Sequence, residues 1–192
     1  MKNQIKYILL IILGLILITH NNVNAQTKYG NTLNAGLGIG GYSGYYSYTG
    51  RSIPVINLNY ELDVAKNFTI APFVSFYTLS RNYYWGNNNV VYRNYTYRET
   101  VIPIGIKGSY YFDDYLKANP KWDFYLAGSI GFAIVNRTWD DGYGGDKNYF
   151  NNAQPIILDV HIGTEYHFNN KIGAFLDLSS GVSTIGLSFH TK

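Results

Sequence analysis

The chain has 192 residues, with 15 Lys and Arg against 12 Asp and Glu, and a formal net charge of +3. It contains no cysteine, which excludes a small secreted domain held by disulfides and a lipid anchor attached through cysteine. Removing Lys2 and Lys6 with the first 25 residues leaves 13 basic residues against 12 acidic ones, a net charge of about +1 that gives no support for a nucleic-acid partner.

Residues 1–25 have the pattern of a cleaved secretory signal. Lys2 and Lys6 precede an apolar run from Ile8 to Ile18, and Val23-Asn24-Ala25 suits a signal peptidase site. The apolar run is about half of the ~20 residues that a membrane-spanning helix needs. The sequence therefore predicts a signal peptide over 1–25 and a single domain over 26–192.

From residue 29 onward, apolar residues alternate with small or polar ones. Side chains of a strand point to opposite faces with period two, so this alternation predicts strands with one apolar face and one polar face. No helix is predicted after the signal peptide. Eight strands are expected, over residues 31–42, 53–62, 68–79, 100–112, 122–135, 154–168, 172–179 and 184–190.

The connections differ in length between the two ends of the expected sheet. Segments 43–52, 80–98, 136–152 and 180–183 fall at one end, and the shorter 63–67, 113–121 and 169–170 fall at the other. Segment 80–98 is interpreted as a long loop or the extended end of a hairpin, and Asn169-Asn170 as a two-residue turn, since Asn tolerates positive φ. Long loops outside and short turns inside are typical of outer-membrane barrels.

Aromatic residues on the apolar faces gather near the short-turn end, as in the girdle of a membrane barrel. Most predicted strands also exceed the ~5–6 residues of an average soluble strand and suit the ~9–11 of a tilted membrane strand. A belt of aromatic side chains at one level is typical of a membrane interface. The predicted girdle on the periplasmic side comprises Tyr60, Phe68, Tyr110, Phe112, Trp122, Phe124, Tyr166 and Phe168.

The polar faces carry charged residues that a soluble core rarely holds, whereas the inside of a membrane barrel is polar. We expect these residues to form a structural ion network in the lumen: Glu61, Lys107, Asp123, Asp159, His161, Glu165 and Asp177. The predicted fold is an all-β, eight-stranded antiparallel up-and-down transmembrane barrel with outer-membrane lipid around it. The alternative is a soluble, exported, lipocalin-like binder.

Three segments resemble the small outer-membrane β-barrel proteins of Gram-negative bacteria, of the OmpX and OmpA-barrel type, and the β-barrel-domain proteins common in Bacteroidetes. They are the Ala25-Gln26 junction, the stretch from Asn57-Leu58-Asn59-Tyr60-Glu61 to Ile70-Ala71-Pro72-Phe73-Val74, and the closing Gly186-Leu187-Ser188-Phe189. The resemblance covers the whole mature chain and implies an outer-membrane location and insertion by the barrel insertion machinery. Such barrels commonly finish on an aromatic residue, whereas here His190-Thr191-Lys192 follow Phe189.

Catalysis has little support in the sequence. A His beside carboxylates can serve acid–base chemistry or bind a metal, so His161 with its lumen carboxylates leaves a small lipid-modifying enzyme as an alternative. Outer-membrane lipid A deacylases use a His-x-Ser arrangement, and no His here has Ser two residues later. His167 is expected at the rim of the barrel. The acidic segment from Asp140 to Asp146 could offer oxygen ligands to Ca²⁺, but it lacks the ligand spacing of an EF-hand loop. We predict no catalytic residue, cofactor or metal.

Tyr and Trp in the long segments are the better indication of function, because these side chains are favoured in binding surfaces. The predicted role is envelope structure or contact with an extracellular partner by a monomer, through loops 80–98 and 136–152. The candidate contact residues are Tyr83, Tyr84, Trp85 and Trp139.

Overall fold

A computed structural model describes residues 31–41, 52–87, 89–147 and 156–191. Its eight strands form a closed antiparallel barrel in chain order, in which β8 pairs with β1. This confirms the predicted up-and-down barrel. The predicted signal peptide and nearly all of segment 43–52 lie outside the described residues. Within the described ranges, no helix combines the length and the apolar character needed to cross a membrane.

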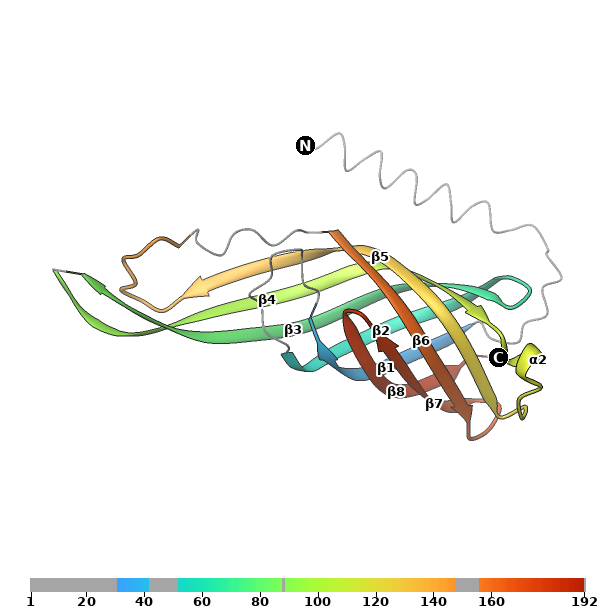
Figure 1. Ribbon diagram of the computed structural model, residues 1–192. Coiled ribbons are helices and arrows are strands. Elements are labelled where there is room, and N and C mark those ends of the chain that lie inside the picture. Colours follow the sequence, from blue (N-terminus) through green and yellow to red (C-terminus); the bar gives the residue numbers. More distant parts are fainter. Residues whose placement is uncertain (1–30, 42–51, 88, 148–155, 192) are drawn as a thin grey trace.

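The strands are unequal in length, so the barrel is much taller on one side. β3, β4 and β5 have 20, 22 and 18 residues, whereas β1, β7 and β8 have 9, 8 and 9. Figure 1 shows the long strands running far beyond the others at the end opposite the short turns. The bounds are β1 Thr32–Gly40, β2 Ser52–Ala65, β3 Phe68–Asn87, β4 Val90–Tyr111, β5 Trp122–Trp139, β6 Ile156–His167, β7 Ile172–Ser179 and β8 Val182–His190.

The two faces of the barrel wall differ as the alternation predicted. Large apolar side chains are exposed on the outside of every strand, for example Leu58 at 43% and Val160 at 70%. The inward side chains are buried and mostly polar or charged. The barrel is thus apolar outside and polar inside, the reverse of a soluble domain.

The prediction of a loop over 80–98 was wrong in its larger part. β3 and β4 continue as a paired hairpin to Asn87 and Val90, so only the alternative of an extended hairpin end is correct. β5 likewise continues past the predicted boundary at 136 to Trp139, which pairs with Tyr97. We call residues 78–87, 90–100 and 136–139 the extension. Alternating Tyr and Trp residues favour strand here, and β4 pairs with β3 on one side and with β5, as far as Trp139, on the other.

The connections at the short-turn end also differ from the predictions. A four-residue helix, α2 (Asp113–Leu116), lies within segment 113–121, where no helix was expected, and Lys117 ends it with a φ of 49°. The two-residue turn at 169–170 is a longer bend over 168–171, and its Asn residues do not have positive φ. Asn169 instead accepts hydrogen bonds through Oδ1 from the backbone N–H groups of Lys171 and Ile172. At the opposite end, the β7–β8 turn is Ser180–Gly181, shorter than predicted.

Inside the barrel, glycine makes room for large side chains from neighbouring strands. Gly163 of β6 pairs with Tyr125 of β5, and a Cβ at position 163 would overlap the Tyr125 ring. Gly36 and Gly186 likewise leave space for the ring of Phe175. The lumen is therefore filled by side chains, as expected for eight strands.

Candidate functional site: the barrel interior and the extension

The structure distributes the seven predicted lumen residues over three places. Glu61, Lys107, His161 and Asp177 meet in a central network. Asp123 and Glu165 lie at the short-turn rim, and Asp159 lies towards the other end, where its Oδ1 accepts a hydrogen bond from Ser180. All seven side chains are on the inner face of the strands.

Lys107 is the centre of the central network. Its Nζ donates to Asp177 Oδ2 at 3.1 Å and lies 3.8 Å from Glu61 Oε1. The Lys107 side chain is only 8% exposed, and both carboxylates are buried more deeply. An ammonium group buried this far is stable only when paired, so the lysine ties strands β2, β4 and β7 together across the lumen.

Two tyrosines complete this network and were missed in the sequence. Tyr111 donates to Glu61 and Tyr125 donates to Asp177, each over 2.7 Å. The Lys107 ammonium also lies 4.9 Å from the centre of the Tyr125 ring. Their inward position could have been read from the alternation, because both fall on the polar face of a predicted strand.

His161 joins the central network to Ser129. Its Nδ1 lies 2.7 Å from Asp177 Oδ1, and its Nε2 lies 3.0 Å from Ser129 Oγ. This order of serine, histidine and aspartate is that of hydrolase triads. Nothing in the sequence indicates this contact, because Ser129 lies on a separate strand and belongs to no local motif with His161.

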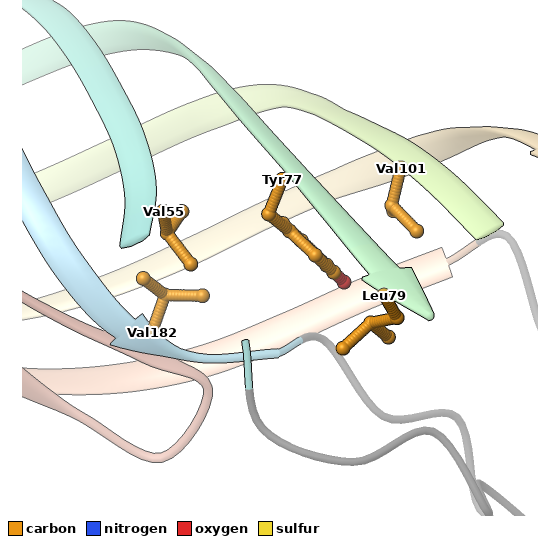
Figure 2. Packing of buried hydrophobic residues seen from close by; sticks show 5 residues of the cluster. All are labelled: Val55, Tyr77, Leu79, Val101 and Val182. Carbon is orange, nitrogen blue, oxygen red and sulfur yellow. The ribbon is translucent and has the colours of Figure 1, made fainter. Parts of the chain in front are cut away.

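The space around these groups is small and closed. A cavity of about 20 Å³ lies among Lys107, Ser129, His161 and Asp177, which is room for about one water molecule. Towards the extension, five apolar side chains pack together inside the barrel (Figure 2): Val55, Tyr77, Leu79, Val101 and Val182.

The short-turn rim holds a second cluster with two histidines. His167 Nε2 lies 2.7 Å from Asp123 Oδ2, and His190 Nε2 lies 2.9 Å from Glu165 Oε1. The two imidazole rings are 5.0 Å apart. His167 was predicted at the rim, but His190, two residues from the chain end, was not predicted to take part. Only closure of the barrel brings β8 to this cluster.

The structure places the eight predicted girdle aromatics at the short-turn end. Phe68 and Tyr110 are cross-strand partners, and Trp122 lies 4.8 Å from Tyr166 between ring centres. Phe112, Phe124 and Phe168 continue this chain of ring contacts, and Tyr60 lies beside Thr191. No comparable aromatic belt lies on the outward face at the other end among the described residues.

The predicted loop-contact residues lie on strands of the extension, and three of the four pack together on its inner face. Trp139 stacks on Tyr143 at 4.0 Å, and Tyr83 meets both of these rings edge-on. Only Tyr84, at 66% exposed, is on the opposite face. We call the packed group the aromatic cluster: Tyr83, Trp85, Tyr95, Tyr97, Trp139 and Tyr143.

The edges of the aromatic cluster are fixed by charged groups. The Tyr97 hydroxyl donates to Glu99 at 2.7 Å, and Arg137 lies 3.5 Å from the other oxygen of Glu99. Burial, together with this hydrogen bond, raises the pKa of Tyr97 to about 12. Arg93 lies over the Tyr95 ring at 4.6 Å and donates to the carbonyl of Asp141.

The acidic segment from Asp140 to Asp146 has a structural contact of its own. Asp140 Oδ2 accepts a hydrogen bond of 2.6 Å from the backbone N–H of Thr96, and the Asp140 N–H donates to the Thr96 carbonyl. The bond from Thr96 lowers the pKa of Asp140. This carboxylate therefore holds the start of the segment after β5 against β4.

No family model matches the chain, and no curated protein matches it. The outer membrane protein Ail of Yersinia pestis, in a phospholipid bilayer nanodisc, is 9% identical with a TM-score of 0.40, over 82% of this chain and 96% of that one. The outer membrane protein W of E. coli is 12% identical with a TM-score of 0.43, over 86% of this chain and all of the other.

Proposed function

We propose that the chain is an integral outer-membrane β-barrel with a non-enzymatic role in the envelope or at the cell surface. The observation that carries this proposal is the ring of exposed apolar side chains around all eight strands. In water such a surface drives aggregation, whereas in lipid it is the favourable state. Closure of the sheet also leaves no unpaired strand edge within the barrel, as a lipid environment requires.

The outward faces of the long strands also mark where the membrane ends. In β3 the outward residues change from apolar to polar between Phe76 and Thr78, and in β4 between Ile102 and Thr100. Thr78 and Thr100 pair directly, and Asn136 of β5 pairs with Thr100. The apolar stretches below this level are close to the ~9–11 residues of a tilted membrane strand. The extension therefore stands outside the membrane.

The absence of cysteine allows a clean test of insertion and orientation. Asn89→Cys labels the tip of the extension, and Leu116→Cys, in α2, labels the opposite end. We expect a membrane-impermeant maleimide to label Asn89→Cys on intact cells, and Leu116→Cys only after lysis. Heat-modifiable gel migration reports the folded barrel. Recovery of the protein in the soluble periplasmic fraction would contradict the proposal.

The surface role is assigned to the tip of the extension. Its inner face is occupied by the aromatic cluster, whereas Tyr84, Val91 and Tyr92 are exposed by 66%, 85% and 58%. Tyr84 and Tyr92 lie 5.7 Å apart between ring centres and form a paired aromatic surface. We expect the double variant Tyr84→Ser/Tyr92→Ser to reduce adhesion of cells to one another or to solid surfaces, at an unchanged amount of barrel. Equal adhesion would overturn the surface role and leave the barrel assignment intact.

The second candidate function is that of a hydrolase with its active site in the lumen. It is favoured by the contacts that connect Ser129, His161 and Asp177. The closed cavity of about 20 Å³ speaks against a lipid substrate. A fluorophosphonate probe tests it on the folded barrel: labelling lost in Ser129→Ala supports the enzyme, and no labelling of the wild type excludes it.

A further inference from the structure

Three side chains from two non-adjacent strands converge at the short-turn rim of the lumen. Glu165 and His167 belong to β6 and His190 to β8. Glu165 Oε1 lies 2.9 Å from His190 Nε2 and 3.7 Å from His167 Nδ1, and all three atoms are within 4.8 Å of one another. In a tetrahedral site with metal–ligand bonds of ~2.0–2.1 Å, ligand atoms lie about 3.3 Å apart. The observed separations are close to that spacing.

Two of these atoms are buried without a hydrogen-bond partner. Glu165 Oε1 and His190 Nε2 lie 2.9 Å apart, an ion-pair distance when His190 is protonated, but neither atom has a partner in hydrogen-bond geometry, and Glu165 is only 5% exposed. An unsatisfied buried acceptor is destabilising, and native structures rarely keep one without a reason. A cation held between the two atoms would satisfy both.

The second nitrogen of each imidazole is already held by a neighbouring side chain. His167 Nε2 contacts Asp123 Oδ2 at 2.7 Å, and His190 Nδ1 contacts Thr32 Oγ1 at 2.9 Å. These contacts orient both rings so that the remaining nitrogens face Glu165. Histidines that bind metals are held in this way, by a carboxylate or another oxygen on the ring nitrogen that faces away from the ion.

Position 173 on the intervening strand is a glycine, which opens the space between Glu165 and β8. β7 lies between β6 and β8, and Gly173 pairs with His167 on one side and Ser188 on the other. A Cβ at position 173 would overlap Glu165 Oε1. The carboxylate reaches His190 because this strand has no side chain there.

We propose that Glu165, His167 and His190 bind a divalent transition-metal ion, with Zn²⁺ as the best match to two imidazoles and one carboxylate. Asp123 and Thr32 are the positioning residues. The histidine side chains are 20% and 13% exposed, so an ion can enter from the rim. The bound ion links the C-terminal strand to β6 and leaves a fourth position for water.

The test uses the full chain without a histidine tag, refolded in detergent and freed of metal with a chelator. Titration with zinc sulfate in a calorimeter is expected to give one Zn²⁺ per chain. Co²⁺ in place of Zn²⁺ is expected to give the intense visible absorption of a four-coordinate site. Absence of zinc binding up to about 1 mM would overturn the proposal.

Matched variants separate this site from unspecific binding to acidic residues. Glu165→Gln and His190→Gln are each expected to weaken zinc binding at least tenfold. Glu99→Gln, which alters another buried lumen glutamate, is expected to bind zinc as the wild type does. If the Glu165 and His190 variants fold and keep wild-type affinity, the assignment is wrong. If they fail to fold, the Co²⁺ spectrum of the wild type decides: the weak absorption of six-coordinate Co²⁺ contradicts the site.

Discussion

Thr78 of β3 and Thr100 of β4 lie opposite each other with their hydroxyl oxygens 3.3 Å apart. Below this pair the outward side chains of both strands are apolar, and above it they are polar as far as Asn82 and Asn94. The pair thus marks the level on the barrel wall at which we propose that the membrane ends.

A charged residue on the outer face should lower the free energy of unfolding more within the apolar stretch than at the level of the threonine pair. Ile106, in the middle of the apolar stretch of β4, is 50% exposed on the outer face. We expect Ile106→Arg to lower the free energy of unfolding in lipid by about 2–4 kcal/mol and Thr100→Arg by about 0–1 kcal/mol. Urea unfolding in lipid vesicles, followed by tryptophan fluorescence, measures both. Equal costs would contradict the proposed boundary.

Removing the ammonium group of Lys107 should destabilise the barrel strongly. In Lys107→Met the carboxylates of Asp177 and Glu61 lose their shared cation while they remain buried. We expect a loss of about 3–5 kcal/mol, because an unpaired buried charge is costly. The exposed Lys121→Met is the control, and the unfolding midpoint in urea is the measurement. A small effect of Lys107→Met would mean that the lysine is not the centre of the network.

Alanine is expected to destabilise the barrel at position 163 but to have almost no effect at position 128. A methyl group at position 163 would overlap the Tyr125 ring and push its hydroxyl away from Asp177, whereas at position 128 its nearest neighbour is the Asp159 carbonyl oxygen at 3.9 Å. We expect Gly163→Ala to cost about 1–3 kcal/mol, as overpacking does. Gly128→Ala should be nearly neutral. The temperature at which heat-modifiable gel migration is lost ranks the two variants.

Acid should detach the segment after β5 from β4. Because the folded pKa of Asp140 lies below its ordinary value, the bond to Thr96 is fully present above about pH 4 and is lost as the pH falls through the lower, folded pKa. The protection of the Thr96 amide, measured against the intrinsic exchange rate at the same pH, should therefore decrease at low pH. Asp140→Ala, which removes the acceptor, should leave the Thr96 amide unprotected at all pH values, and Asp141→Ala should behave as the wild type. A Thr96 exchange rate independent of the Asp140 charge would contradict this.

The barrel itself could be predicted because the residue pattern that indicates it lies within each strand. Period-two alternation assigns each side chain to a face before any pairing is known, so the inward positions of Glu61, Lys107 and Asp177 followed from the sequence. The end of a strand is less well encoded. Asn and Gly between residues 86 and 89 indicate a loop, whereas the alternating Tyr and Trp residues on both sides of them belong to paired strands.

The partners inside the lumen could not be predicted in the same way. Ser129 meets His161 because β5 and β6 pair in one register, and His190 meets Glu165 because the barrel closes and Gly173 has no side chain. These contacts depend on strand pairing over long sequence separations. A pattern read along the chain does not contain that information.

The pairing of β1 with β8 also sets an order of assembly. The contact between Thr32 and His190 joins residues 158 positions apart, whereas the β3–β4 hairpin closes between Asn87 and Val90. Local hairpins form quickly, but a distant pairing must wait for loop closure. Since β8 is synthesised last, the edge of β1 has no partner until the final strand is available. Until β8 pairs with it, that edge of β1 is an unpaired strand edge, which is a site of aggregation.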